Sequence, residues 1–519
     1  MGLFAFENAP FLDFNDPDEK ALMLRTVQSI RSRLGKTYAL RMGEHNRPVH
    51  STFPSINPME PNEVVGIMAE AHPSDVEDAV RAAERAYPSW SRVPVWDRAA
   101  VLLRAGHLLR QRRRQMLAWI ALEVGKNWSQ ADGEVAEAID HFEWNAREVL
   151  RWDEGRPIQP LAQEFNQYRY RSLGVGAVIS PWNFPTTLPL GMIVAAIAAG
   201  NTVVFKPAED ASVIAHQLLD ILNEAGLPQG VVNLVTGQGS VVGPALVTHP
   251  RIRFVAFVGS RQVGTQIHRN ASGLLPGQVH LKRVMTEMGG KNATIVADDA
   301  DLDWAAQEIS AAAFGYQGQK CSATSRVIAM RPIYQELLDR VAAIAADVSS
   351  QYGPPENNAP YGPVINQKAL DKILRYYALA PSEGTLALAG RRLDTAGFGV
   401  TPLIVSQVST ESPLFREEIF GPALTFTMAD DFDQALNLAN DCEYALTGAV
   451  FTRSPERLAE ARDRFYVGNL YLNRSSTGAM AGVHPFGGYK GSGTGPKVGS
   501  PDYLGFFLEA QTITEKVRY

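Results

Sequence analysis

The chain is poor in cysteine, with only Cys321 and Cys442 among its 519 residues. Two cysteines cannot form a disulfide framework or a cysteine-rich zinc site, and such scarcity is typical of a reducing compartment. The ten histidines show no spacing typical of metal ligands. We therefore expect a cytoplasmic protein that holds no metal.

A strong excess of one charge is also missing, since the formal net charge is -6 and the isoelectric point is near 6.0. No nucleic-acid partner is expected from this balance. The one basic cluster, Arg110 to Arg114, follows an apolar-periodic stretch and predicts the solvated end of an amphipathic helix. Because no basic region precedes an apolar one at the N-terminus, we expect neither secretion nor lipidation.

Only one uncharged run, residues 181–205, is long enough to raise the question of a membrane span, for which about 20 apolar residues suffice. Pro189 and Gly200 interrupt this run. Thr186 or Thr187 is a good N-cap, Pro189 suits a first helical turn, and Gly200 suits a helix end. The run therefore predicts a buried helix followed by a buried strand, and no membrane partner is expected.

Helical patterns alternate with short apolar strands through most of the chain, which indicates a parallel α/β architecture. In the first series, the expected helices are 73–87, 96–123, 133–152 and 214–224, and the expected strands are 176–179, 202–205, 231–234, 254–258 and 292–296. The second series has expected helices at 301–315, 332–347, 432–440 and 455–465, with strands at 326–330, 402–406 and 447–451. Two α/β domains with a boundary near Gly289 follow from this repetition.

Three segments lie outside both series. Residues 159–173 and 510–518 alternate polar and apolar side chains at period two, which is typical of strands with one covered face. They predict an accessory sheet between subunits, and hence at least a homodimer. The first 45 residues contain a helix around Lys20 to Leu34 and form an N-terminal extension.

Cys321 lies in an uncommon setting, the run Phe314-Gly-Tyr-Gln-Gly-Gln-Lys-Cys-Ser-Ala-Thr-Ser325, whose small uncharged residues leave room around its sulfur. A thiol with a free pKa of about 8.5 needs a base, a positive field or a helix N-terminus to become a strong nucleophile. Upstream, Glu287 stands among apolar residues and glycines, where a carboxyl group can keep a raised pKa and act as a general base. Taken alone, the two residues also fit structural roles.

Two glycine runs are candidate phosphate sites. Phe257-Val-Gly-Ser-Arg-Gln-Val-Gly264 follows an expected strand and opens a helix, so Gly259 allows close approach of a phosphate and Ser260 supplies a hydroxyl. Residues 237–243 imitate a dinucleotide fingerprint, but their third glycine is displaced by one position. We expect that second run to be a turn.

Polar residues also follow two expected strands, at the sheet edge where nucleotides bind. Lys206-Pro-Ala-Glu-Asp210 places Lys206 and Glu209 within reach of ribose hydroxyls, although an ordinary solvated loop is the simpler interpretation of the run alone. In Ser180-Pro-Trp-Asn-Phe-Pro185, two prolines fix a turn that carries Asn183. A rigid amide of this kind suits an oxyanion.

Two later segments add weaker signals. Arg416-Glu-Glu-Ile-Phe-Gly-Pro422 joins carboxylates to a Phe, which by itself also fits a charged loop with one buried aromatic. Ser476-Thr-Gly-Ala479 and His484-Pro-Phe-Gly-Gly488 are rich in glycine and could capture an anion with backbone N–H groups.

Taken together, the motifs resemble the aldehyde dehydrogenase superfamily in order and spacing over nearly the whole chain. They are Pro181-Trp-Asn-Phe-Pro185, Lys206-Pro-Ala-Glu209, Phe257-Val-Gly-Ser260, Glu287-Met-Gly-Gly290, Gly318-Gln-Lys-Cys321, Glu418-Ile-Phe-Gly-Pro422 and Pro485-Phe-Gly-Gly488. The resemblance implies the α/β aldehyde dehydrogenase fold, with two Rossmann-like parallel-sheet domains and a small oligomerisation sheet. It further implies a helical N-terminal extension, expected at 1–46, and an NAD-binding domain, expected at 47–156 and 176–288. A catalytic domain is expected at 289–480, and oligomerisation strands are expected at 157–175 and 500–519.

The same resemblance implies a mechanism and a catalytic set. Cys321 would attack the aldehyde carbon, the Asn183 amide and the Cys321 backbone N–H would hold the oxyanion, and Glu287 would deprotonate water. The implied cofactor is NAD, because a carboxylate at Glu209 disfavours a 2′-phosphate, while Lys206 leaves NADP possible. The residues implied to bind the cofactor are Trp182, Lys206, Glu209, Gly259, Ser260, Val263, Glu418 and Phe420.

Within the superfamily, the chain resembles the group that oxidises L-glutamate γ-semialdehyde to L-glutamate in proline catabolism. This resemblance rests on the segments Glu123-Val-Gly-Lys-Asn-Trp128, Tyr316-Gln-Gly-Gln-Lys-Cys-Ser-Ala323, Gly468-Asn-Leu-Tyr-Leu-Asn-Arg474, Thr477-Gly-Ala-Met-Ala-Gly482 and Ser492-Gly-Thr-Gly-Pro-Lys-Val-Gly-Ser-Pro-Asp-Tyr503. It implies that Ser322, Gly478 and Ala479 anchor the substrate carboxylate. It also implies that Phe184 and Phe486 enclose the aliphatic chain and that Glu137 lies near the amino group. For Glu137, a place on a helix surface is the simpler interpretation.

Ser475, Ser476 and His484 depart from the pattern of that group. A dehydrogenase of another semialdehyde, such as succinate semialdehyde, is therefore one alternative, with NAD or NADP as cofactor. A non-catalytic protein on the same scaffold is the other.

Overall fold

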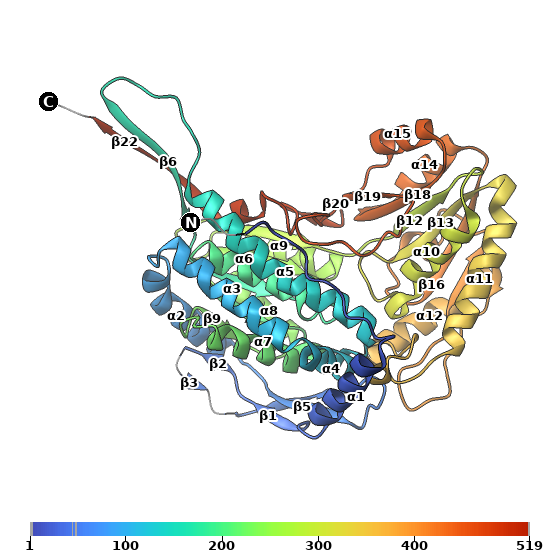
Figure 1. Cartoon of the computed structure of the whole chain (residues 1–519), viewed down its shortest axis with the longest axis horizontal. Helices are drawn as coiled ribbons and strands as arrows, with labels where there is room; N and C mark the ends of the chain where they lie inside the picture. Colours follow the sequence, from blue (N-terminus) through green and yellow to red (C-terminus); the bar gives the residue numbers. More distant parts are fainter. Residues whose placement is uncertain (1–3, 44, 47–48, 517–519) are drawn as a thin grey trace.

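The computed structural model of the chain describes residues 4–43, 45–46 and 49–516, and it is organised by two large sheets (Figure 1). The first sheet has the order β21-β11-β10-β7-β8-β9-β2-β3. Its strands are β2 Arg41–Met42, β3 His45–Asn46, β7 Val175–Ile179, β8 Thr202–Lys206, β9 Val232–Leu234, β10 Phe254–Val258, β11 Arg283–Glu287 and β21 Gly493–Thr494.

The central part of this sheet, from β11 to β9, is parallel throughout. Chain order runs outward in opposite directions from β7 and β10, so the topological switch point lies between these two strands. Ligands of such sheets bind at the carboxyl ends of the strands near this point.

The second sheet has the order β14-β15-β16-β13-β12-β18-β19, and all neighbours are parallel except the edge strand β14. Its strands are β12 Asn292–Val296, β13 Thr324–Met330, β14 Thr385–Leu388, β15 Leu403–Ser406, β16 Ala423–Ala429, β18 Thr447–Phe451 and β19 Asn469–Leu472. The remaining strands form small sheets: β1 Lys36–Tyr38 with β5 Val64–Ala69 and β4 Thr52–Ile56, β17 Tyr444–Ala445 with β20 Tyr489–Lys490, and β6 Glu164–Ser172 with β22 Leu508–Lys516.

Helices cover both large sheets. Those associated with the first half of the chain are α1 Pro17–Arg31, α2 Pro73–Trp90, α3 Val95–Gln111, α4 Arg113–Val124, α5 Trp128–Asp153, α6 Thr187–Ala198, α7 Ser212–Glu224, α8 Gly239–Thr248 and α9 Arg261–Ala271. Those of the second half are α10 Leu302–Phe314, α11 Tyr334–Ser350, α12 Gln367–Glu383, α13 Pro413–Arg416, α14 Phe432–Asn440 and α15 Pro455–Arg464. Figure 1 shows the two sets as separate halves of the molecule, so the predicted α/β fold is confirmed.

The uncharged run forms the buried helix α6, which begins after Thr186 and ends before Gly200, where φ is +88°. Strand β8 follows it, as predicted. Within the described ranges, no helix is long and apolar enough to cross a membrane.

The prediction of one helix over 96–123 is wrong, because two helices occupy this range. Helix α3 ends and α4 begins at Arg112, where φ is -98° and ψ is 13°. The basic cluster there is not simply solvated. Arg113 is buried and lies 2.5 Å from Asp132, and Arg114 forms an ion pair with Glu19. A buried arginine needs such a partner, so the break in the helix serves to aim Arg113 inward.

The two alternating segments pair as β6 and β22, in antiparallel register from Glu164 with Lys516 to Ser172 with Leu508. Residues 517–518 of the second predicted segment lie outside the described residues. In Figure 1 this ribbon projects from the rest of the molecule. Its place between subunits stays a prediction.

Candidate active site

Cys321 lies in the loop between the short 3-10 turn Gly315–Gly318 and β13, at the amino edge of the second sheet. Tyr316, Gln317 and Gly318 are all left-handed, with φ of 54°, 53° and 67°. Non-glycine residues adopt this conformation at a cost of about 1–3 kcal/mol each, and persist there only where the surroundings fix them. A Cβ at Gly318 would lie 2.5 Å from the carbonyl of Gly421, so the loop is closely packed.

The backbone at Cys321 and just after it is fixed by Asn292 from the start of β12. Its Nδ2 donates to the carbonyl oxygens of Cys321 at 2.7 Å and Ala323 at 2.8 Å, and its Oδ1 accepts from Thr447 N at 3.0 Å. The sequence analysis missed this residue, since nothing in the motif marks an asparagine so far upstream as a partner of the cysteine.

Glu287 ends β11 and brings its carboxylate to the thiol. The Cys321 Sγ donates to Glu287 Oε1 at 3.5 Å. Burial raises the pKa of Glu287 to about 7, and burial together with the nearby carboxylate raises the pKa of Cys321 well above its ordinary value. The structure therefore pairs a protonated thiol with a carboxylate that can accept its proton near neutral pH.

Asn183 lies in the loop after β7, with its side chain buried. Its Nδ2 donates to the carbonyl of Gln319, two residues before Cys321, at 3.0 Å. An amide nitrogen carries two hydrogens, so one remains available for an oxyanion. The loop is held from behind, because Lys126 Nζ donates to the Asn183 carbonyl at 2.7 Å.

Beside the cysteine lies a cavity of about 480 Å³. It is lined by Cys321, by Glu287 and by all of the predicted substrate residues: Glu137, Phe184, Ser322, Gly478, Ala479 and Phe486. Asn183 does not line it. Lys320, Arg474 and His141 also line the cavity. The sequence analysis assigned them no role, although Lys320 and Arg474 stand within the motifs of the resemblance, because the motifs do not show which side chains face the cavity.

The loop with Gly478 and Ala479 is tied to the cysteine loop. Ser476 Oγ donates to the Ser322 carbonyl at 3.0 Å. Arg474 Nη2 donates to the carbonyl of Gly478 at 3.1 Å, and Gly478 has a φ of +78°. These contacts turn the loop toward the cavity, where a substrate carboxylate can meet its backbone.

The simpler expectation for Glu137, a place on a helix surface, is wrong. Glu137 lies on the face of α5 that lines the cavity, and burial raises its pKa to about 8. Its position on the cavity wall places the carboxyl group where it can meet an ammonium group that enters the cavity.

The predicted cofactor residues gather elsewhere, at the carboxyl ends of β7, β8 and β10. Lys206 is buried, with its Nζ 2.8 Å from the Pro207 carbonyl and 3.4 Å from Glu209 Oε2. Ser260 caps α9, where its Oγ accepts from Val263 N at 3.3 Å. Gly259 N donates to the Glu287 carbonyl at 3.1 Å, which joins this edge to the base.

The glycine run 237–243 is not only a turn, as expected, because α8 begins within it at Gly239. Gly239 N donates to Glu209 Oε1 at 2.6 Å. The free N–H groups of this helix therefore lie beside Glu209 and attract its carboxylate. The sequence analysis missed this helix start because the displaced third glycine departs from the dinucleotide fingerprint. The displacement does not prevent the helix from forming.

Trp182, Glu418 and Phe420 complete the set near the second sheet. The Trp182 and Phe420 rings meet edge to face at 5.7 Å, and Phe420 is left-handed with φ of 60°. Gly290 N donates to Glu418 Oε1 at 3.0 Å. A Cβ at Gly289 would lie 2.0 Å from the Glu418 carboxylate, so only glycine allows this approach.

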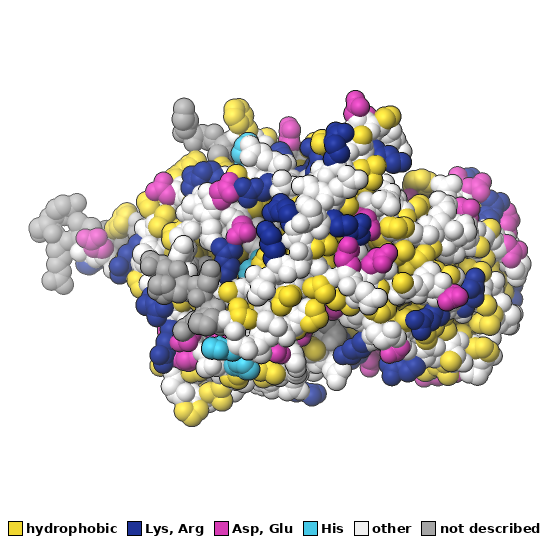
Figure 2. Space-filling model, turned by 90° about the horizontal axis from the view of Figure 1, so that it is seen from below, with side chains coloured by type: hydrophobic (Ala, Val, Ile, Leu, Met, Phe, Trp, Pro, Cys, Tyr) yellow, Lys and Arg dark blue, Asp and Glu magenta, His cyan; other side chains and the backbone are white. Residues whose placement is uncertain are grey.

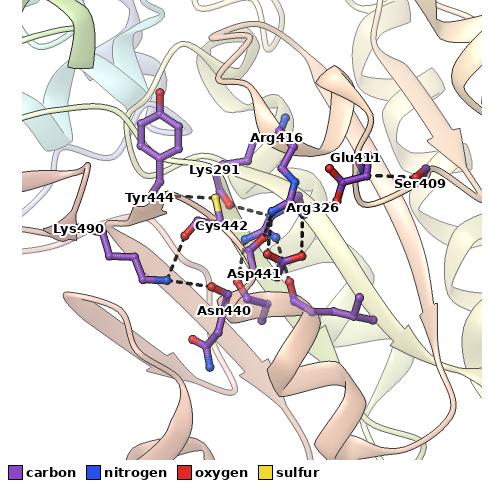
Figure 3. Close-up of polar contacts among 12 residues, drawn as sticks. Lys291, Arg326, Ser409, Glu411, Arg416, Asn440, Asp441, Cys442, Tyr444 and Lys490 are labelled. Atoms are coloured by element: carbon purple, nitrogen blue, oxygen red, sulfur yellow. Dashed lines mark hydrogen bonds and ion pairs between the residues drawn. The ribbon is translucent and has the colours of Figure 1, made fainter.

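Figure 3 shows the polar contacts around the buried Arg326, which reaches the residue before β12. Arg326 donates to the carbonyl oxygens of Lys291 at 2.9 Å, Leu438 at 3.1 Å and Ala439 at 2.9 Å. Cys442 lies among these residues, where its Sγ accepts from Tyr444 N at 3.4 Å. The second cysteine thus has a structural place away from the cavity.

The fold and the arrangement of the site define an aldehyde dehydrogenase. Residues 45–513 match the aldehyde dehydrogenase family, and the chain belongs to that family. Among the part of the chain that the structure describes, no group of three or more His, Cys, Asp or Glu side chains is placed to hold a metal.

Individual relatives are more specific. The chain is 43% identical over 511 residues to 1-pyrroline-5-carboxylate dehydrogenase of Anoxybacillus flavithermus, covering 98% of this chain and 99% of the relative. A solved structure of 1-pyrroline-5-carboxylate dehydrogenase from Thermus with bound NAD is 43% identical, with a TM-score of 0.97 and coverage of 99% of this chain and 100% of that one. Proline utilization A from Bdellovibrio bacteriovorus is 40% identical, with a TM-score of 0.96, over 99% of this chain and 53% of that one.

Proposed function

We propose that the protein oxidises L-glutamate γ-semialdehyde, the open form of 1-pyrroline-5-carboxylate, to L-glutamate with NAD, as a step of proline catabolism. The observation that carries the proposal is the contact of the Cys321 thiol with Glu287 at the wall of a cavity. Ser322, Gly478 and Ala479, the residues predicted to bind a carboxylate, line the same cavity. Relatives of the same length that are 43% identical bear the name of this activity.

The residues present fit NAD. Glu209 has a side chain 41% exposed at the end of β8, and the N-terminus of α9 follows Gly259 and Ser260 beside the switch point. A carboxylate accepts hydrogen bonds from ribose hydroxyls, and a helix N-terminus binds phosphate. Trp182, Lys206, Val263, Glu418 and Phe420 would complete the site. When bound, the nicotinamide accepts a hydride from the substrate.

In the first half of the mechanism, Glu287 takes the proton of Cys321 and the thiolate attacks the aldehyde carbon. The new oxyanion accepts hydrogen bonds from Asn183 Nδ2 and the Cys321 backbone N–H. Loss of hydride from this hemithioacetal leaves a thioester on Cys321.

In the second half, Glu287 first releases the proton of Cys321 to solvent. The ionised carboxylate then removes a proton from water, and the hydroxide adds to the thioester carbon. Collapse of the tetrahedral adduct expels the Cys321 thiolate and releases the carboxylate product. A carboxyl group with a pKa of about 7 is well suited to both transfers.

Substrate choice rests on both ends of glutamate semialdehyde. Ser322, Gly478 and Ala479 would bind the α-carboxylate, and Glu137 would face the α-ammonium group. Phe184 and Phe486, which line the cavity, would enclose the aliphatic chain of a short ω-oxo amino acid.

The test is reduction of NAD, followed by absorbance, with 1-pyrroline-5-carboxylate and in parallel with succinate semialdehyde. Preference for the pyrroline is expected, and preference for succinate semialdehyde would contradict the proposal. Cys321→Ala should abolish turnover, while Cys442→Ala, the matched control, should retain it.

We further propose the predicted domain division, a cytoplasmic location and a homodimer or higher oligomer built through β6 and β22. The exposed, alternating ribbon of these strands supports the last point, since a two-stranded sheet is marginal without a partner.

A further inference from the structure

The N-terminal strap, defined as residues 4–12, runs along α5 toward α1 (Figure 1). Arg147 Nε donates to the Phe4 carbonyl at 3.1 Å, the Phe6 and Trp144 rings meet at 5.2 Å, and Asn8 Nδ2 donates to Asp140 Oδ2 at 2.8 Å. Positions 140, 144 and 147 share one face of a helix. The strap therefore follows α5 turn by turn.

Two buried carboxylates of α5 anchor the strap. Asp140 and Asp132 are 3% and 2% exposed. Asp140 Oδ1 accepts from Ala9 N at 2.7 Å, and Asp132 Oδ2 accepts from Leu12 N at 2.8 Å. Because a buried carboxylate needs hydrogen-bond donors, both sides of these contacts are held in place.

The other side of the strap faces the active site. Ala9 and Phe11 line the same cavity as Cys321. Asn8 Nδ2 donates a second hydrogen bond to the Ala481 carbonyl at 3.0 Å. Ala481 lies two residues beyond Ala479, so the strap contacts the loop that presents the carboxylate anchor.

That loop packs against the strap at a second point. Gly482 has a φ of +76°, and a Cβ there would lie 2.8 Å from the Trp144 ring and 3.0 Å from the Phe6 ring. Arg474 binds the loop at its other end through the Thr477 and Gly478 carbonyls. The anchor segment is thus fixed from both sides, and Asn8 supplies the link to α5.

We propose that the N-terminal strap is part of the substrate site, and that Asn8 is a positioning residue that selects aldehydes carrying a carboxylate. The two hydrogens of its amide join Asp140 to Ala481, which sets the distance of Gly478 and Ala479 from Cys321. This inference rests on the proposed function, because it assumes that the loop binds the substrate carboxylate.

The test compares Asn8→Ala with Asn15→Ala, a control whose asparagine is exposed beyond the same strap. Each variant is assayed with glutamate semialdehyde and with propanal, which has no carboxylate. For Asn8→Ala we expect KM for glutamate semialdehyde to rise roughly 10-fold, with kcat and the propanal kinetics nearly unchanged. Asn15→Ala should match the wild type on both substrates.

Asn8→Ser keeps one donor and should lie between Asn8→Ala and the wild type. An equal loss on both aldehydes in Asn8→Ala and Asn8→Ser would overturn the inference, and so would no loss on either. Should the wild type fail to oxidise glutamate semialdehyde, the proposed function falls; the same comparison with succinate semialdehyde then decides the role of the strap.

Discussion

Lys126 Nζ lies 2.5 Å from Glu134 Oε2, and neither side chain is exposed to solvent. The pair encloses the loop that carries Asn183, because Lys126 donates to the Asn183 carbonyl and Glu134 Oε1 accepts from Thr186 N at 2.7 Å. The ammonium group also lies 3.8 Å from the centre of the Phe184 ring. One ion pair thereby fixes the backbone at the predicted oxyanion donor and three residues beyond it.

Lys126→Met should destabilise the fold by about 3–5 kcal/mol, because it leaves the Glu134 carboxylate buried without its cation. Urea unfolding measures the change. The double variant Lys126→Met, Glu134→Gln removes the uncompensated charge and should be more stable than the single variant. The opposite order would show that the charge of Glu134 is not the source of the loss.

Lys126→Met should also lower kcat, through displacement of Asn183. In the Asn183→Ala background, the same substitution should lower kcat little further, since the amide that it positions is already absent. A double-mutant cycle on kcat measures this coupling. Full additivity would separate Lys126 from the oxyanion site.

The pH dependence of kcat/KM should follow Glu287. Its pKa is raised to about 7, so the carboxyl is protonated and inactive as a base below that value and ionised above it. Activity should therefore rise as the pH increases through about 7. Glu287→Gln should lose this limb and lower kcat by roughly 100-fold or more. A flat wild-type profile across neutral pH would contradict the assignment.

Cofactor preference should depend on the charge of Glu209. Glu209→Gln removes the carboxylate that would repel a 2′-phosphate, so kcat/KM should rise for NADP and fall for NAD. Steady-state assays with both cofactors measure the ratio. Asp220→Asn, on the adjacent helix α7 and exposed, is the control and should leave the ratio unchanged.

Arg326→Met should lower stability by about 3 kcal/mol or more, because three carbonyl groups around a buried cation lose their donor. Thermal unfolding measures the shift. Arg331→Met is the matched control, since the Arg331 side chain is 62% exposed and its ion pair with Asp430 contributes about 0–1 kcal/mol. Equal shifts in both variants would remove the special role of Arg326.

Much of the fold could be predicted from the sequence, because a strand such as 254–258 is almost fully buried and forms a continuous apolar run. Strand β11 was missed, since it begins with Arg283 and ends with Glu287 and so resembles a polar segment. The break between α3 and α4 was missed as well, because it depends on the distant partner Asp132.

In the active site, too, some residues could be predicted from the sequence and others could not. The sequence motifs supplied Cys321, Glu287 and the predicted substrate residues, all of which line the cavity. Asn292, Lys126 and Arg474 were missed because each acts on a backbone carbonyl, and no spacing in the chain reports which carbonyl a side chain will meet. The orientation of Glu137 toward the cavity likewise depends on how α5 is turned.

Helix α5 carries Asp132 and Asp140 for the strap, Glu134 for the Asn183 loop and Glu137 for the cavity. Each residue added to a helix rotates everything beyond it by about 100°. Insertions or deletions between 132 and 140 would therefore displace side chains for the strap, the Asn183 loop and the cavity relative to one another. The β6–β22 ribbon, by contrast, can change length without touching the cavity. During divergence of this enzyme, α5 can vary in sequence on its outer face but not in length between positions 132 and 140.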